Sequence, residues 1–333
     1  MKRGYRDSVR GGEGASAPSC FNAFSLLELL VAMVVLVLFL GILLSASNQS
    51  GVILQRANNQ ARAYQSARFA FDLITRTLSQ STLNVYYDYD DPGEPAAYIR
   101  KSDLHFVIDA PPLDSFEQGN AIFFQAPLGR TGDVANYGGL PGLLNAVGYY
   151  VTYGKDPGLP PFLQALDRNR FRLMQYLDPS EDLGVYSSIA KQWFSKTALQ
   201  NHSSVIADNV ILLLFWPRLS EAEDPIGNSL SDNYLYDSRL PAAPAAQKIT
   251  THQQPPLVEV TLVAIDESDA NRLPDQSTPP IEITEALEDL FQKSTRNDYA
   301  SDLASLEGRL AAKGIGYRVL TRTVALRESK WTK

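Results

Sequence analysis

One carboxylate stands inside a long apolar run near the start of the chain. The run extends from Phe24 to Ala46, and Glu28 is its only ionisable residue, with Ser25 and Ser45 as the other polar interruptions. An ionisable group at the edge of a membrane is costly, so Glu28 is expected to have a partner and a role. The alternative is that its side chain reaches the interface and stays solvated.

A second group of carboxylates lies farther along the chain and is a weak calcium candidate, because Ca²⁺ prefers oxygen ligands. The group consists of Asp88, Asp90, Asp91 and Glu94. It lacks the spacing of an EF-hand, which favours a solvated loop instead. Beside it, Tyr86, Tyr87 and Tyr89 either form a contact surface or, as is usual for aromatic residues between a helix and a sheet, belong to the core.

Residues for enzyme chemistry are sparse. His105, His202 and His252 are the only histidines, and no two of them have metal-ligand spacing, so each is interpreted as structural or solvated. The chain has no Gly-x-Ser-x-Gly elbow and no phosphate-binding glycine loop. Cys20 is the only cysteine, which excludes a disulfide within the chain and a thiolate metal cluster. We therefore predict no enzymatic activity, no catalytic residue and no cofactor.

Composition narrows the class of protein. The 333 residues are 44% hydrophobic and 20% charged, enough for a real core in one or two domains. The net charge is −7, although the segment before Ala23 is basic, so the rest of the chain is more acidic still. Nucleic-acid binding rests on Lys and Arg neutralising phosphates, and an acidic body therefore predicts no nucleic-acid partner.

The apolar run predicts one membrane span. Its length as a helix would be roughly 35 Å, which exceeds a bilayer core of about 30 Å. A buried core helix is the alternative, but such helices rarely stay apolar on every face for this length. Basic residues precede the run, so the positive-inside rule places the N-terminus in the cytoplasm and the rest of the chain after the run on the other side of the membrane.

The order of features around the run carries a family resemblance. The motif Ala23-Phe24-Ser25-Leu26-Leu27-Glu28 places a small residue before the apolar run, whereas an ordinary secretory signal has it after the apolar core. The motif resembles the cleavage and methylation site of type IV prepilins and pseudopilins. This resemblance implies that a prepilin peptidase cuts between Ala23 and Phe24 and methylates the new N-terminus; most members have glycine where this chain has Ala23.

The same resemblance implies a role for Glu28. Its carboxylate would pair with the N-terminal ammonium of a neighbouring subunit as the chain leaves the membrane for a helical fibre. Shorter segments (QSARFAFDLITRTLSQSTLN, ADNVILLLFW, PPLVEVTLVAIDE and YRVLTRTVAL) resemble the J-type minor pseudopilins of type II secretion, the PulJ, GspJ and PilW-like group. RFRLMQY, PPLVEVTLVAIDE and the late helices also resemble the pilin-like cassette protein C group of Verrucomicrobia.

The predicted organisation is α+β and pilin-like. Residues 1–23 form a cytoplasmic leader, 24–46 the membrane half of a long helix, 47–82 its amphipathic half, and 83–333 a β-rich periplasmic domain. An apolar stripe marks the amphipathic half: Ala57, Ala61, Tyr64, Ala67, Phe71, Ile74 and Leu78. No proline interrupts this helix, which would run to about Leu78 over roughly 80 Å.

Strands are expected at 104–109, 120–125, 146–153, 171–176, 205–216, 257–265 and 317–326, and helices at 283–293 and 299–313. One antiparallel sheet would lay a face on the long helix. The proline-rich segment 217–256 is expected to be a long exposed or partly disordered insertion.

Two functions follow as hypotheses. The first is a structural subunit of a type II secretion or type IV pilus-like fibre, with other pilins and pseudopilins as partners. The second is a cargo-binding or adhesin-like module delivered by the same leader, with a secreted cargo as its partner. Both place the chain in the inner membrane.

Overall fold

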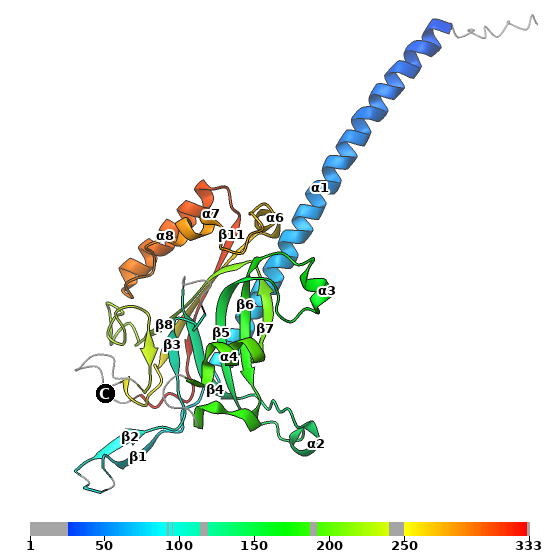
Figure 1. Ribbon diagram of the computed structural model, residues 1–333. Coiled ribbons are helices and arrows are strands. Elements are labelled where there is room, and N and C mark those ends of the chain that lie inside the picture. The colour runs from blue at the N-terminus through cyan, green and yellow to red at the C-terminus, as the bar shows by residue number, and fades with distance from the viewer. Residues whose placement is uncertain are drawn as a thin grey trace, which may run out of the picture. The chain divides into compact units, whose positions relative to one another are not determined.

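The structure separates a helical N-terminal unit from a mixed body. The computed structural model describes residues 26–91, 93–94, 96–113, 119–186, 192–239 and 250–331, with only the backbone for residues 45–63. The chain divides into two compact units, Met1–Gln55 and Arg56–Lys333. Helix α1 (Leu26–Leu78) contributes to both, and every described strand lies in the second unit (Figure 1). The α+β class is confirmed.

Helix α1 buries the predicted stripe from Ala67 to Leu78, whereas Tyr64 of the same stripe is only partly buried. Ala67, Phe71, Ile74 and Leu78 are at most 4% exposed, and Ala70 joins them. Their spacing of three and four residues puts them on one face. Ala57 and Ala61 fall among the residues of which only the backbone is described. The helix ends at Leu78, so residues 79–82 of the predicted 47–82 segment instead form a turn and a bridge from Thr82 to Gln125.

Among its described residues the body contains three antiparallel sheets rather than the single sheet predicted. The largest has the order β7-β6-β5-β4-β3-β9: Ser203–Asp208, Arg170–Asp178, Leu144–Gly154, Ala121–Pro127, Val107–Asp109 and Tyr236–Asp237. The second has the order β11-β10-β8: Tyr317–Ala325, Leu257–Ile265 and Val210–Arg218. The third is a hairpin of β1 (Tyr86–Tyr89) and β2 (Tyr98–Lys101) that was not predicted.

The predicted strand 205–216 is broken at Asn209, and this break separates the two larger sheets. Asn209 has φ 62°, a left-handed conformation that Asn tolerates better than most residues. Its N–H donates to Phe171 O in β6 (2.7 Å), and its carbonyl accepts from Ile265 N in β10 (2.9 Å). One residue therefore links both sheets while the chain passes from β7 to β8.

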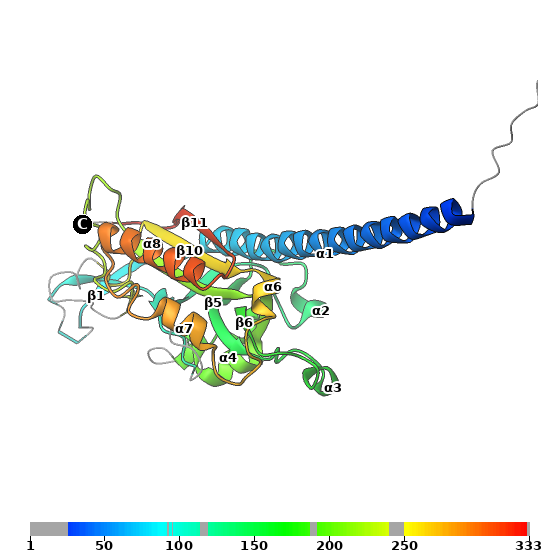
Figure 2. The same cartoon turned by 90° about the horizontal axis from the view of Figure 1, so that it is seen from above.

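The three-stranded sheet lies between two helices. Val258, Val260, Leu262 and Ala264 form one face of β10, as the alternation predicted. On that face Arg322 of β11 bonds Asp72 (3.0 Å) and Thr75 (2.9 Å) of α1. On the other face Tyr299 of α8 (Arg296–Ala312) bonds Thr261 at 2.7 Å. The face of β10 that carries Glu259, Thr261 and Val263 is thus turned toward α8, which lies beside β10 in Figure 2.

The six-stranded sheet is also covered on both faces. Its Tyr149 hydroxyl bonds the Thr77 side chain of α1 on one side. On the other, Phe123 stacks on Phe194 with ring centroids 4.1 Å apart, under the turn Gln192–Phe194 and helix α4 (Lys196–His202). Short helices occupy the connections: α2 (Val134–Tyr137), α3 (Pro161–Gln164), Ser180–Asp182 and Gly184–Tyr186. The body's core therefore includes the last turns of α1, from Ala67 to Leu78.

Both helices predicted late in the chain are present, but their bounds differ from the predicted 283–293 and 299–313. They are α7 (Ile281–Leu287) and α8, with a short α6 (Glu267–Ala270) before them. Helix α8 ends where glycine was expected to end it: Gly314 has φ 67°, Ile315 N–H donates to Leu310 O, and Gly314 N–H donates to Ala311 O (both 3.0 Å). This is a Schellman motif, which satisfies carbonyls that the helix leaves open.

The prediction that 217–256 forms an exposed insertion is wrong for the part of it that the structure describes. Leu219, Leu230 and Tyr234 are at most 6% exposed, and β9 within this segment pairs with β3. Asp224, 3% exposed, accepts from Gly227 N (2.8 Å) and Ser229 N (2.9 Å). Burial raises the pKa of Asp224, but these hydrogen bonds outweigh it and lower the pKa overall. Residues 240–249 lie outside the described residues.

Candidate functional site

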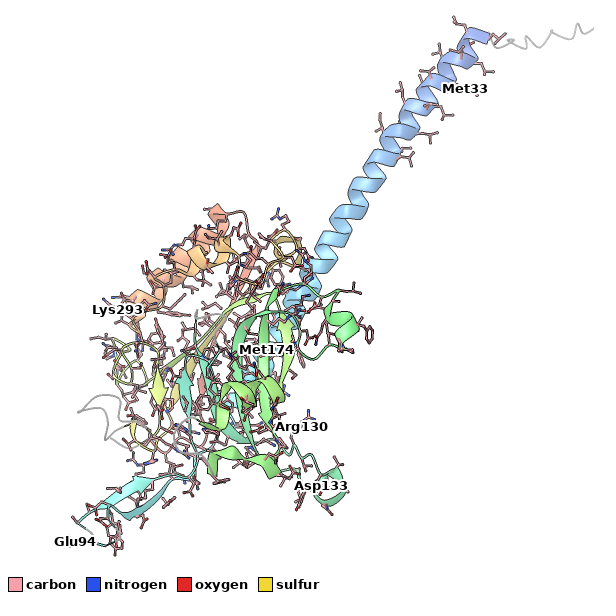
Figure 3. The ribbon with its side chains drawn as sticks, in the orientation of Figure 1. Met33, Glu94, Arg130, Asp133, Met174 and Lys293 are labelled. Carbon is pink, nitrogen blue, oxygen red and sulfur yellow. The ribbon has the colours of Figure 1, made fainter. Side chains whose placement is uncertain are left out.

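Glu28 lies in the first described turn of α1. It is exposed, as is every side chain described from Leu26 to Leu44. Figure 3 labels Met33, 62% exposed, among the apolar side chains that project from this part of the helix. Leu26–Leu44 is the one helix among the described residues that is long and apolar enough to cross a membrane. The predicted processing residues Ala23 and Phe24 lie outside the described residues.

The aspartates of the calcium candidate bond to groups of their own hairpin. Asp88 pairs with Lys101 (3.0 Å), and this bond lowers the pKa of Asp88. Asp90 accepts from the backbone N–H groups of Ala97 and Ala96 (both 3.0 Å), which lower its pKa. Asp91 accepts from Gly93 N at 2.7 Å. Within the described part of the chain, no group of three or more His, Cys, Asp or Glu side chains is placed to hold a metal.

The tyrosines beside this turn are exposed, so their assignment to the core is wrong. Tyr86, Tyr87 and Tyr89 are 40%, 63% and 43% exposed, and Tyr98 is 67% exposed. Tyr89 and Tyr98 stack at 4.7 Å, and their hydroxyls share a 2.9 Å hydrogen bond. The β1–β2 hairpin, whose tip carries Glu94 in Figure 3, is therefore an aromatic ribbon on the surface.

The three histidines lie in separate structural networks. His105 is 1% exposed; its Nδ1 accepts from Trp193 Nε1 (3.2 Å), so the proton lies on Nε2, which donates to Asp237 (2.7 Å). His202 pairs with Asp178, whose other oxygen accepts from the Tyr176 hydroxyl.

His252 has a left-handed backbone with φ 52°, and burial, with nearby Arg239 and Arg100, lowers its pKa. Its N–H donates to Ser238 O at 2.6 Å, so it joins the end of the predicted insertion to the residue that directly follows β9. Among the described residues, none of the three histidines belongs to a group of three or more side chains that could hold a metal ion.

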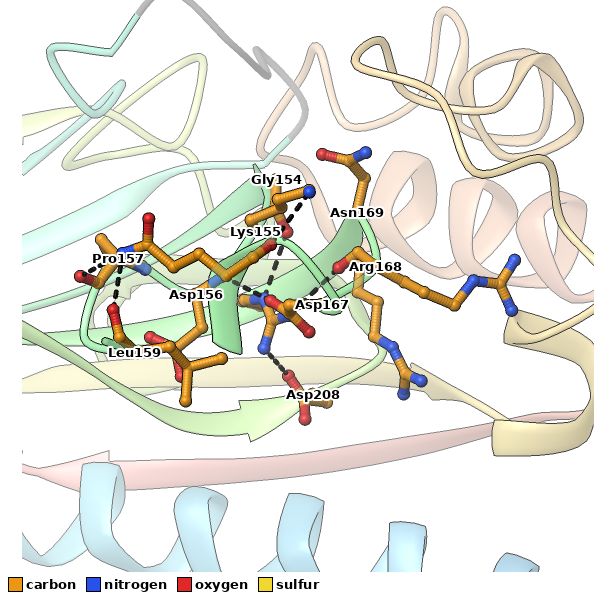
Figure 4. Close-up of polar contacts among 12 residues, drawn as sticks. Gly154, Lys155, Asp156, Pro157, Leu159, Asp167, Arg168, Asn169 and Asp208 are labelled. Carbon is orange, nitrogen blue, oxygen red and sulfur yellow. Dashed lines mark hydrogen bonds and ion pairs between the residues drawn. The ribbon is translucent and has the colours of Figure 1, made fainter. Parts of the chain in front are cut away.

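Sequence reasoning missed a buried charge cluster at the base of the β5–β6 connection (Figure 4). Arg172, 4% exposed, bonds Asp167 (2.6 Å) and Asp208 (2.8 Å), and its Nε donates to Gly154 O (3.1 Å). Burial raises the pKa of Asp208, and Arg172 partly offsets this effect. The available signal was an arginine at an inward position of the apolar strand RFRLMQY, because a charge there needs a partner.

Comparison with known proteins gives no relative. No protein-family model matches this chain, and neither a curated protein nor a solved structure is similar enough to it to count as a match. Function therefore has to be inferred from the residues and their geometry.

Proposed function

We propose that this chain is a pilin-like subunit of the minor pseudopilin kind. The proposal rests on the difference in exposure between the two ends of α1. Its first part, Leu26–Leu44, is apolar and exposed on all sides, whereas its last turns are buried in the core of the body. A subunit that waits in a bilayer and then packs among the helices of a fibre needs this combination.

In the proposed pathway the leader 1–23 is cytoplasmic, Leu26–Leu44 spans the inner membrane and the body is periplasmic. The basic leader supports this orientation through the positive-inside rule. A prepilin peptidase cuts after Ala23, and other pilins or pseudopilins are the partners. No catalytic residue and no cofactor is assigned in this proposal.

Glu28 is proposed to bind the N-terminal ammonium of a neighbouring processed subunit. Its exposure in the first described turn of α1 leaves the carboxylate accessible to another chain. Between apolar helices such a pair fixes register, because an unpaired charge there is strongly disfavoured.

Replacing Glu28 should therefore separate processing from assembly. We expect Glu28→Gln and Glu28→Leu to be cleaved as the wild type is, yet to be depleted severalfold from fibres sheared from cells that co-express the peptidase and partner pilins. Glu28→Asp, which keeps the charge, is the control and should assemble better than either. Equal recovery of all three variants with the wild type would remove the pairing role.

The exposed hairpin favours a second candidate, a cargo-binding or adhesin-like module. Tyrosine is enriched at protein interfaces because its ring is apolar and its hydroxyl polar. Deletion of the proline-rich segment is a poor test, because it would also remove Leu219, Leu230 and Tyr234 from the core.

We expect Tyr87→Ser with Tyr98→Ser to lower the free energy of unfolding by about 1 kcal/mol, because both side chains are exposed but Tyr98 loses its ring contact and hydrogen bond with Tyr89. If the module function holds, cargo recovery or surface attachment falls while the chain's recovery in fibres stays at the wild-type level. Unchanged cargo recovery and attachment would remove the hairpin as the binding surface.

A further inference from the structure

Strand β11 forms one edge of the three-stranded sheet, beside β10 (Figure 2). It is 9 residues long, contains no proline, and pairs with β10 without a register shift. Proteins commonly shorten, bulge or cover an edge strand, because its unpaired N–H and C=O groups can accept another strand. Since β11 is neither short nor bulged, the cover on its outer edge decides whether that edge can bind.

Hydrogen bonds at the two ends of the β10–β11 pair show which backbone groups face outward. Asp266 N–H donates to Gly316 O (2.9 Å) at one end, and Leu326 N–H donates to Pro256 O (3.1 Å) at the other. In an antiparallel pair, residues that bond the partner strand alternate with residues whose N–H and C=O point away. Even-numbered residues of β11 therefore bond β10. The outward groups belong to the odd-numbered residues Tyr317, Val319, Thr321, Thr323 and Ala325.

Within the described part of the chain, these outward backbone groups have no hydrogen-bond partner. Thr321, Thr323 and Ala325 are exposed, while Tyr317 and Val319 are partly buried. Water satisfies exposed N–H and C=O groups, so the strand is stable without a neighbour. The same groups can pair with a further strand that replaces the water.

The opposite edge of this sheet, formed by β8, is closed. Asn120 N–H donates to Leu213 O (3.1 Å). The Asn120 side chain accepts from Phe215 N–H (2.7 Å) and donates to Phe215 O (2.9 Å). Asn120 is 6% exposed, so these bonds seal the β8 edge from solvent. Among the described residues, β11 is the edge of this sheet that keeps a run of open backbone groups.

Two arginines on the α1 side of β11 indicate which kind of strand fits this edge. Arg318 and Arg322 are four residues apart on one face of the strand, about 13 Å in an extended chain. Arg318 lies over the Tyr64 ring, 4.7 Å from its centroid, and forms no hydrogen bond with a described residue. Arg322 bonds Asp72 and Thr75 through Nη1 and is 52% exposed, so its Nε and Nη2 are open. A carboxylate can therefore bind either guanidinium group.

Charge favours an acidic segment over a second copy of this chain at the edge. Residues 317–327 contain three arginines and no Asp or Glu. A second copy paired on the same edge would add its own Arg318 and Arg322 to the same face, and like charges across a sheet are destabilising. Acidic side chains at those positions would instead form charge-assisted hydrogen bonds.

We propose that β11 accepts an extended acidic segment of a partner chain as an additional strand of the sheet. The segment runs antiparallel to β11, bonds the odd-numbered residues through its backbone, and places carboxylates opposite Arg318 and Arg322. Backbone hydrogen bonds supply affinity, and the two arginines supply the preference for acidic side chains at the same spacing. This contact goes beyond the pairing proposed for Glu28 and depends on neither processing nor a membrane.

Synthetic peptides test the proposal with the purified full chain in detergent. The probe is a fluorescent 9-residue peptide, matched to β11, in which Thr alternates with Val and Glu replaces Val at two positions four residues apart. One control carries Lys in place of Glu. The other keeps Glu but is N-methylated at the Thr residues, which removes the donors that would face β11. Binding is measured by fluorescence anisotropy.

The Glu peptide is expected to bind, and both control peptides to bind at least about tenfold more weakly. An N-methylated peptide that binds as tightly as its parent would reduce the contact to charge attraction and overturn the added strand. Equal binding of the Lys peptide would overturn the acidic partner. Absence of binding by the Glu peptide would overturn the proposal as a whole.

A pair of variants locates the binding on β11. Thr323→Pro removes an outward N–H without breaking a bond to β10, and should weaken binding of the Glu peptide by about tenfold. Thr323→Ala keeps that N–H and should bind as the wild type does. Circular dichroism checks that both variants fold, and the N-methylated peptide gives the same test on the wild type. Self-association of the wild type that Thr323→Pro abolishes would assign the edge to a second copy, and the acidic partner would be wrong.

Discussion

The variant Arg172→Leu is expected to lower the free energy of unfolding by about 1–3 kcal/mol, because Arg172 is buried with its hydrogen-bond partners, whereas Asp208 is 43% exposed and water screens that pair. Arg172 is 4% exposed and bonds two carboxylates, Asp167 and Asp208, together with the carbonyl oxygen of Gly154. Leucine fills part of the space but leaves both carboxylates and the carbonyl without this donor. The free energy of unfolding is measured by urea titration of the full chain in detergent.

The pH dependence of the variant gives an independent check. Burial raises the pKa of Asp208, and loss of Arg172 should raise that pKa further. A carboxyl whose folded-state pKa is raised destabilises the folded state when it ionises, so the variant should regain stability relative to the wild type as pH falls below this pKa. The difference in the free energy of unfolding between Arg172→Leu and the wild type is therefore expected to become smaller as the pH falls toward about 4.

A surface pair supplies the control for Arg172→Leu. Lys313 bonds Glu285 at 2.7 Å, but Glu285 is half exposed, so Lys313→Met should cost less than about 1 kcal/mol. Equal losses from Lys313→Met and Arg172→Leu, or a constant difference across pH, would contradict the role given to the buried cluster.

The largest effect expected on processing comes from Ala23→Leu, which should leave the leader attached in almost every molecule. The resemblance to prepilins implies a peptidase that accepts only a small residue before the cut, and leucine adds a branched side chain there. Ala23→Gly is the matched control, because it restores the residue most prepilins have and should be cleaved at least as completely as the wild type. Both variants are compared by intact mass after co-expression with a prepilin peptidase. Complete cleavage of Ala23→Leu would contradict the assignment of the site.

Elements with strong periodicity were predictable from the sequence. The buried stripe of α1 followed from spacings of three and four, and β10 coincides with the predicted 257–265 because its apolar residues alternate. Asn209 was harder to interpret, since 205–216 is β-rich on both sides of it and a left-handed residue is set by partners from distant strands. The segment 217–256 was misjudged because its composition suggests disorder, whereas Leu219, Leu230 and Tyr234 find a core built by other elements.

The candidate site was predictable only in part. Glu28 stands out in the sequence because a lone carboxylate in an apolar run is unusual, and the structure places it in the first described turn of α1. The exposure of Tyr87 and Tyr98 was not predictable, because β-propensity is the same on a protruding hairpin and in a core strand. The partners of Arg172 were equally hidden, since Asp208 is distant in sequence and meets it only through the pairing of β6 with β7.

The central claim, that this chain is processed as a pilin-like subunit, is tested most directly by the intact mass and N-terminal sequence of the protein purified from membranes, with and without a co-expressed prepilin peptidase. We expect a chain that begins at N-methylated Phe24 when the peptidase is present and at the unprocessed leader when it is absent. A chain that keeps residues 1–23 in the presence of the peptidase would contradict the claim and leave a membrane-anchored domain with no path into a fibre.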